Sequence, residues 1–188
     1  FYSDELCVIF NGEIYNYIEL RNSLIKKNIK FETNSDTEVL LKYYKYYGAN
    51  CLKYFEGMWS FAIYDFKKKI IFLSRDRFGE KPLYYLVDKQ NNFFFGSEIK
   101  FIRSLSAKNL SVNYDKISKF LNFDFKSLKK DEGFFFKKVQ EVKRGEYLII
   151  NENNKIKIAK YWEPKVKIKN KISLNETISQ IRKNLVQS

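Results

Sequence analysis

The stretch Asn11-Gly12-Glu13-Ile14-Tyr15-Asn16-Tyr17 is the one around which this chain of 188 residues is organised. An apolar run over residues 6–10 precedes it, and apolar residues at helical spacing follow it. This change of period predicts a strand that runs into Asn11, a turn at Gly12 and a helix after it. Side chains at such a strand end are held by a sheet and remain exposed.

The same stretch carries groups that suit catalysis on a carbonyl compound. Asn11 offers a side-chain amide donor, and Gly12 offers a backbone N–H that no side chain shields. Two such donors side by side are the parts of an oxyanion hole. Glu13 adds a carboxylate that could hold a substrate ammonium. The alternative is a plain Asn-Gly turn between two elements.

The longer motif resembles the glutamine-binding motif of class II glutamine amidotransferase domains, in the version found in glutamine-hydrolysing asparagine synthetases. Four further stretches resemble that family in the family's order, and Tyr161-Trp162 also fits. These stretches are Ser35–Glu38, Phe55–Ala62, Ser74–Tyr85 and Gly96–Lys100. One departure is Glu80, where the family usually has an aliphatic residue.

The resemblance implies the four-layer αββα fold of N-terminal nucleophile (Ntn) hydrolases, which belongs to the α+β class. The order of patterns agrees, because helices and strand hairpins come in blocks and favour antiparallel sheets with helices outside. The resemblance also implies an N-terminally truncated fragment. Residues 1–162 would then be a partial type 2 glutamine amidotransferase domain. Residues 163–188 would be a linker and the first helix of an ATP-using synthetase domain.

The resemblance assigns roles to four residues. Asn11 and the N–H of Gly12 would form the oxyanion hole, and Glu13 and Asp36 would bind the amino group of glutamine. Asp36 lies in Ser35-x-x-Glu38, which has the form of a capping box, so its alternative role is to favour the helix dipole only. The family's nucleophilic N-terminal cysteine is absent from this sequence, and the fragment alone is therefore expected to be inactive.

In the intact protein, the resemblance implies that ammonia from glutamine attacks β-aspartyl-AMP. That intermediate would be made from aspartate and ATP with Mg²⁺ in a synthetase domain whose Ser-Gly-Gly-x-Asp-Ser loop this sequence lacks. No cofactor and no metal site are expected within these residues.

Composition excludes several kinds of chemistry. The sequence has no histidine, which removes Ser-His-Asp and Cys-His catalysis and His-ligated zinc. Cys7 and Cys51 show no CxxC spacing and are expected to be free buried thiols in a reducing cytoplasm. The sequence shows no signal peptide and no apolar run long enough to span a bilayer, so no membrane partner is expected. A cytoplasmic protein, compatible with a homodimer, is the resulting expectation.

The net charge of +13 leaves a second class of function open. A basic nucleic-acid-binding module is one interpretation, and a solvated lysine-rich surface is the other. Lysines alternate with acidic and apolar residues, which favours the solvated surface and no nucleic-acid partner. Within the family, the acceptor is also open, because relatives amidate cell-surface sugars or make β-lactams.

Several local structures are also predicted from the residues. Asn16-x-x-Glu19 has the form of a capping box. A structural role is predicted for Arg75, Asp76 and Arg77, whose charges could bridge one another within their loop. Residues 165–169 are predicted to form an edge strand protected by lysines, or a linker. Residues 128–133 are predicted to form a charged loop. Strands are predicted over 31–33, 58–65, 70–75, 83–87, 93–95, 134–142, 147–150 and 155–159, and helices over 17–25, 36–47, 97–105, 114–121 and 174–186.

Overall fold

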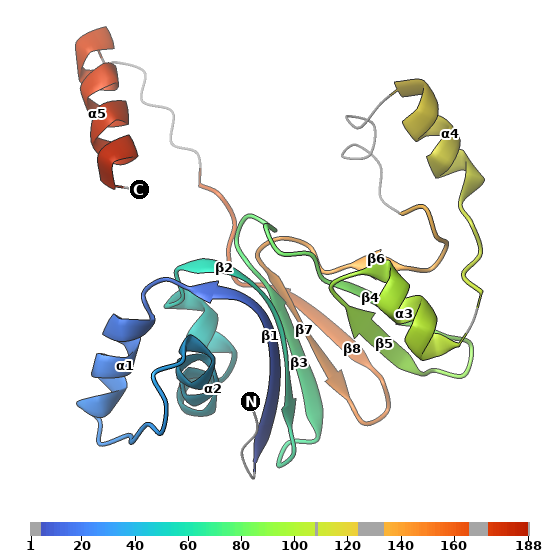
Figure 1. The fold of residues 1–188 in the computed structure, drawn as a ribbon, viewed down its shortest axis with the longest axis horizontal. Coiled ribbons are helices and arrows are strands. Elements are labelled where there is room, and N and C mark those ends of the chain that lie inside the picture. Colours follow the sequence, from blue (N-terminus) through green and yellow to red (C-terminus); the bar gives the residue numbers. More distant parts are fainter. Residues whose placement is uncertain (1–4, 108, 124–133, 166–172, 188) are drawn as a thin grey trace.

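The computed structural model describes residues 5–107, 109–123, 134–165 and 173–187, and it stacks four layers (Figure 1). Two helices, α1 (Tyr17–Ile25) and α2 (Asp36–Tyr47), cover one face of a five-stranded antiparallel sheet. A three-stranded antiparallel sheet covers the other face, and α3 (Ile99–Ser106) packs outside it. The predicted αββα arrangement is confirmed.

The strand order of the large sheet places β1 at one edge. The order is β1-β2-β3-β7-β8, with bounds Leu6–Ile14, Gly57–Asp65, Ile70–Arg75, Glu146–Asn151 and Ile156–Lys160. The small sheet has the order β5-β4-β6, with bounds Phe93–Gly96, Tyr84–Val87 and Gln140–Glu141. Because β1 is an edge strand, one of its sides has no strand partner within the described sheet.

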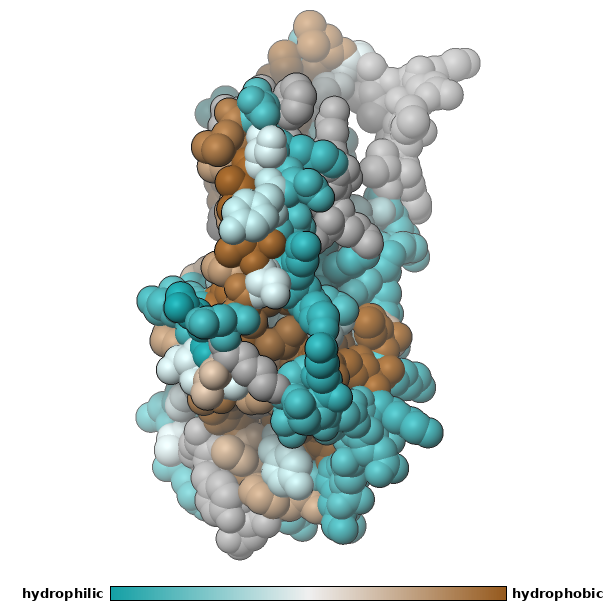
Figure 2. Space-filling model, turned by 90° about the vertical axis from the view of Figure 1, so that its right-hand side faces the viewer, coloured by the Kyte–Doolittle hydropathy of each residue, from teal (hydrophilic) through white to brown (hydrophobic). Residues whose placement is uncertain are grey.

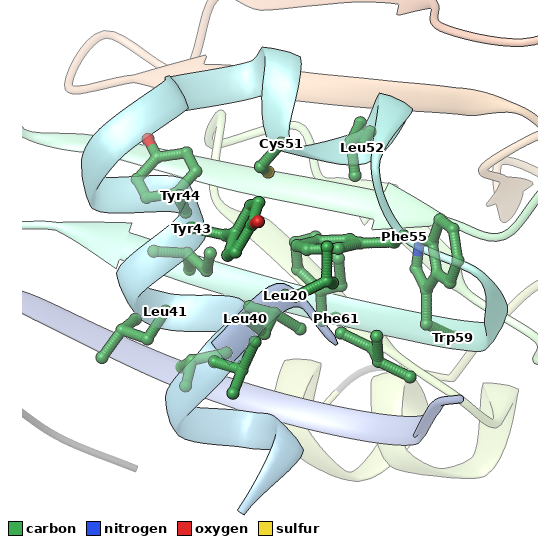
Figure 3. Packing of buried hydrophobic residues seen from close by; sticks show 14 of the residues in the cluster. Leu20, Leu40, Leu41, Tyr43, Tyr44, Cys51, Leu52, Phe55, Trp59 and Phe61 are labelled. Carbon is green, nitrogen blue, oxygen red and sulfur yellow. The ribbon is translucent and has the colours of Figure 1, made fainter. Parts of the chain in front are cut away.

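The two-residue period of the strands divides their side chains between two cores. On β2, Trp59, Phe61 and Ile63 face the helices, while Ala62 faces the small sheet. The core beneath the helices also takes residues from α2 and from the 3-10 helix η1 (Gly48–Lys53), as Figure 3 shows. The register of β1 against β2 is therefore fixed, since a slip by one residue would turn Trp59 out of this core.

The turn predicted at Gly12 is wrong. Strand β1 continues through Gly12 to Ile14 and pairs with β2 over its whole length, so the chain turns at Tyr15 and Asn16. Asn16 is the N-cap residue of α1, but its side chain does not cap the helix. It instead accepts the N–H of Glu56 and donates to the carbonyl of Tyr54, which fixes the turn against the start of β2.

Two predicted strands are also absent or shortened. Residues 31–33 form no strand. The Glu38 carboxylate accepts the N–H groups of Glu32 and Thr33 instead of closing a capping box with Ser35. Of residues 134–142, only Gln140–Glu141 are assigned to a strand. The charged loop predicted over 128–133 and residues 166–169 lie outside the described residues.

Two further helices lie apart from the layered core. Helix α4 (Tyr114–Phe123) exposes Tyr114 and Leu121, and the face seen in Figure 2 shows apolar side chains gathered in its upper part, where α4 lies. Helix α5 (Leu174–Gln187) stands off the sheets in Figure 1. Among the described helices, none combines the length and the apolar character needed to cross a membrane.

Glu38 is a charged residue that the fold buries completely. Its carboxylate accepts the N–H groups of Glu32 and Thr33, at 2.9 and 2.7 Å, and pairs with Lys42 at 2.8 Å. Burial alone would raise the pKa of Glu38, but the bonds from Lys42, Glu32 and Thr33 outweigh it and lower the pKa to about 2. The ionised side chain therefore holds the irregular segment before α2.

Replacing Glu38 with glutamine is expected to lower the free energy of unfolding at neutral pH by roughly 2 kcal/mol, or about 4–8 °C in Tm. A lowered pKa in the folded state stabilises the protein above the ordinary carboxyl pKa, and this contribution is lost as the pH falls from about 5 towards 2. The Tm difference between Glu38→Gln and the parent should therefore shrink over that range in thermal melts. Glu152→Gln, which removes an exposed acid paired with Lys69, is the control and should change Tm little at any pH. A constant Tm difference across the range would contradict this account.

Candidate functional site

The predicted site residues Asn11, Gly12 and Glu13 follow one another on the edge strand β1. Successive side chains of a strand point to opposite faces of the sheet. Val8 and Ile14 are buried beneath the helices, so the exposed side chains of Asn11 and Glu13 lie on the other face. The strand, and not a loop, therefore fixes the directions of these two side chains.

The backbone of Gly12 approaches β2 more closely than another residue would allow. Gly12 has φ +155°, and a Cβ atom there would lie 2.2 Å from the carbonyl oxygen of Met58 and 2.7 Å from Cα of Trp59. No other residue could occupy this position without moving the backbone of β2. The glycine is thus required by strand packing as well as by the access it gives to its N–H.

The N–H of Gly12 faces the open edge of the sheet. Gly12 lies opposite Trp59, and both backbone groups of Trp59 point away from β1, towards Asp76. In an antiparallel ladder the residues of such a pair direct their N–H and C=O groups to opposite sides. Ile14, two positions along, follows the same rule, because its N–H donates to the Asp36 side chain and not to β2.

Asp36 reaches this edge from the first turn of α2. The N-cap Ser35 accepts the N–H of Thr37 at 3.1 Å, as its predicted capping role requires, and so fixes the start of the helix. Asp36 Oδ2 accepts the N–H of Ile14 at 3.1 Å. The structure thus brings Asp36 to the same edge as the N–H of Gly12, at a strand spacing of roughly 7 Å along β1. The carboxylate keeps further lone pairs for a cation.

Ser97 joins the site from the other sheet. It follows the last residue of β5, and its Oγ accepts a hydrogen bond from Asn11 Nδ2 at 3.3 Å across 86 positions of sequence. The residues around Ser97 belong to one of the stretches that carry the resemblance, but nothing in their pattern predicts a contact with Asn11. Only the packing of the two sheets reveals it.

A buried loop supports the end of β2 beside the site. The carboxylate of Asp76, which is 1% exposed, accepts the N–H groups of residues 78–81 and, at 3.4 Å, that of Trp59. Arg75 pairs with Glu141 of the small sheet and not with Asp76. The structural role predicted for this loop is confirmed for these two residues, although they do not bridge each other.

No histidine is available to activate either cysteine, because the sequence contains none. Burial raises the pKa of Cys51, which is completely inaccessible in the core beneath the helices. Both thiols are free, as predicted, but Cys7, the second residue of β1, is half-buried and not buried as expected. The described residues also contain no group of three or more acidic or cysteine side chains that could hold a metal ion.

The arrangement suits an amide substrate that carries an ammonium group. The amide of Asn11 and the N–H of Gly12 are adjacent hydrogen-bond donors for a developing oxyanion. Glu13 and Asp36 are acids beside them, one exposed and one half-buried. Four layers, with two donors and two acids along the edge strand of the large sheet, agree with the Ntn-type architecture that the sequence resembles.

Comparison with known proteins gives the family. Residues 2–162 match the glutamine amidotransferase domain family, and the chain belongs to it. A putative glutamine-hydrolysing asparagine synthetase 2 of Methanocaldococcus jannaschii is 48% identical over 112 residues, which is 60% of this chain and 21% of that protein. Asparagine synthetase 3 of Bacillus subtilis is 31% identical over 179 residues, 95% of this chain and 28% of that protein. This chain therefore spans less than a third of the length of these relatives.

A solved structure agrees on the fold. The glutamine phosphoribosylpyrophosphate amidotransferase of B. subtilis superimposes with a TM-score of 0.61 and 22% sequence identity, over 87% of this chain and 30% of that one. At this identity the likeness shows the architecture alone. It shows that the two sheets and their helix layers are arranged as in that solved structure.

Proposed function

We propose that this chain is the glutamine-hydrolysing part of an ATP-dependent asparagine synthetase. It would convert glutamine to glutamate and release ammonia, which would attack β-aspartyl-AMP made from aspartate and ATP with Mg²⁺ elsewhere in the protein. The observation that carries the proposal is the presence of Asn11, Gly12 and Glu13 on the exposed edge strand of a glutamine amidotransferase domain, with Asp36 bonded to the same strand.

In the proposed reaction, a thiolate attacks the side-chain carbonyl carbon of glutamine, and the carbonyl oxygen becomes an oxyanion. Asn11 Nδ2 and the N–H of Gly12 donate to that oxygen. Glu13 and Asp36 hold the ammonium group and so place the amide over the two donors. The base that deprotonated the thiol returns the proton to the leaving nitrogen, so ammonia departs as the tetrahedral intermediate collapses to a thioester. Water then hydrolyses the thioester to glutamate.

The attacking thiol is not Cys7 or Cys51 in this proposal. One lies within an apolar strand, the other is sealed in the core, and the sequence has no histidine to act as a base. An N-terminal cysteine of the intact protein would carry its own base, the α-amino group, whose pKa is about 7.7–8.0. We therefore expect that the 188 residues alone do not hydrolyse glutamine.

We also propose that residues 1–162 form the amidotransferase domain and that residues 163–188 lead into the synthetase domain. Leu174, Ile178, Ile181 and Leu185 of α5 share one helical spacing and are all more than half exposed. Such an apolar stripe is typical of a helix that packs on another domain. We further propose that the intact protein acts in the cytoplasm, where aspartate and ATP are available to it.

One assay of the intact protein distinguishes asparagine synthesis from the transfer of ammonia to another acceptor. With glutamine, aspartate, ATP and Mg²⁺, the proposal predicts equal amounts of glutamate and asparagine. Glutamate without asparagine would show a different acceptor, such as a sugar or a β-lactam precursor. The matches to asparagine synthetases do not favour that alternative, and family membership does not favour a nucleic-acid-binding module.

Asp36→Asn is expected to raise the KM for glutamine about 10–100-fold with a small change in kcat. The substitution removes a charge-assisted hydrogen bond to the substrate's ammonium, which is worth about 1.5–3 kcal/mol. Asparagine keeps an oxygen that can accept the N–H of Ile14, so the strand edge should stay in place. Steady-state kinetics with glutamine and with ammonia provide the measurement.

Glu56→Gln, which removes an exposed acid near the same end of the sheet, serves as the control for net charge. It should leave the KM for glutamine unchanged. A similar KM increase in both variants, or a loss of ammonia-dependent synthesis in Asp36→Asn, would refute the assigned role.

A further inference from the structure

An oxyanion donor must be held in place before the charge develops, because reorientation during the reaction costs part of the stabilisation. The Asn11 side chain is exposed, and the torsion that orients an asparagine amide is broad. Strand β1 fixes where this side chain starts but not how its amide plane is turned. Some neighbouring group has to determine that orientation.

The neighbours of Asn11 on its own sheet do not supply such a group. Ser60 lies directly opposite Asn11 on β2, and its Oγ has no hydrogen-bond partner although the residue is only 3% exposed. Ser60 therefore does not hold the Asn11 amide, even though it is the nearest hydroxyl in the register of the strands.

Ser97 supplies the contact from the small sheet. Its Oγ accepts one N–H of the Asn11 amide at 3.3 Å. Among the described residues, Ser97 is thus the hydrogen-bond partner of this amide. The second N–H of the same nitrogen is then fixed in direction but remains free to donate. Ser97 is itself held between β5 and α3, which pack together around Ile102 and Phe94.

We propose that Ser97 is a positioning residue that orients the Asn11 amide for oxyanion stabilisation. This inference rests on the proposed function and adds a residue to it. It also gives the small sheet a role in the reaction, because the orientation of a donor on β1 depends on a hydroxyl at the end of β5.

The test uses the intact protein with Ser97→Ala and Ser97→Thr. Loss of the hydroxyl should lower kcat for glutamine hydrolysis about 5–10-fold, as expected for one neutral hydrogen bond, without changing the KM for glutamine. Ammonia-dependent synthesis and Tm should stay at the parent's values. Threonine keeps the hydroxyl and should restore most of kcat. Ser104→Ala, on the exposed side of α3, is the matched control and should behave like the parent.

A double-mutant cycle with Asn11→Ala separates positioning from a general structural effect. Because Ser97 acts through Asn11, Ser97→Ala should cause no further loss of kcat once Asn11 is alanine. The same 5–10-fold loss in both backgrounds, or a parallel loss of ammonia-dependent synthesis, would overturn the inference. If Asn11→Ala itself leaves glutamine hydrolysis unchanged, the proposed function fails along with it.

Discussion

Asn11→Ala is expected to lower the turnover of glutamine hydrolysis by about 10²–10³-fold, the usual effect of losing one oxyanion donor. The side chain is exposed on β1 and lies outside the three hydrophobic cores, so its loss should not disturb the fold. Synthesis from free ammonia bypasses the hydrolytic step and should remain largely intact. Parallel assays of glutaminase and ammonia-dependent activity on the same preparation provide the measurement.

The control for this substitution is Asn22→Ala, which removes an exposed asparagine from α1. This helix covers the face of the large sheet opposite to the one on which the Asn11 side chain lies. Both of its activities should equal those of the parent protein. An equal loss of glutamine-dependent and ammonia-dependent activity in Asn11→Ala would remove Asn11 from the hydrolytic site.

Gly12→Ala is expected to lower the free energy of unfolding by on the order of 4 kcal/mol, a larger loss than that expected for Glu38→Gln. The new methyl group would lie 2.2 Å from the Met58 carbonyl oxygen, and φ +155° is strained for any residue with a Cβ atom. The strands would have to separate where the core residue Trp59 is anchored. Thermal unfolding should show a Tm lower by roughly 8–16 °C.

Gly96→Ala is the matched control, because a Cβ at Gly96 would meet only ordinary contacts, the nearest being 3.4 Å from Phe101 Cβ. Its Tm should stay within about 2 °C of the parent value. If Gly12→Ala fails to fold, its recovery in inclusion bodies beside soluble Gly96→Ala would agree with the expectation. Equal melting temperatures for the two variants would contradict the close strand approach.

Much of the fold could be predicted because its signals are local. The apolar runs of β2 and β3 and the apolar stripe of α2 are patterns that depend on neighbours within a few positions. Adjacency alone left Asn11 and Gly12 open between a plain turn and a donor pair, and the resemblance of the longer motif favoured the donor pair. The resemblance supplied Asp36, whose contact with Ile14 then agreed with that proposal.

The remainder depended on contacts between distant segments. Gly12 lies within a strand and not in a turn because β2 continues the pairing to Ile14, which an Asn-Gly signal cannot reveal. The Glu38 carboxylate accepts hydrogen bonds from residues before its own helix. The capping-box pattern therefore predicted the wrong hydrogen-bond partner for Glu38. The Asn11–Ser97 bond joins two sheets and has no signature in either local sequence.

The central claim is that the Asn11 amide and the Gly12 N–H act on one oxygen of the substrate. The most direct test is a crystal structure of the intact protein bound to an aldehyde analogue of glutamine, which forms a tetrahedral adduct with the attacking thiol. We expect the adduct's oxygen at about 2.7–3.1 Å from both Asn11 Nδ2 and the N–H nitrogen of Gly12. An adduct whose oxygen lies beyond hydrogen-bond distance from either donor would contradict the account.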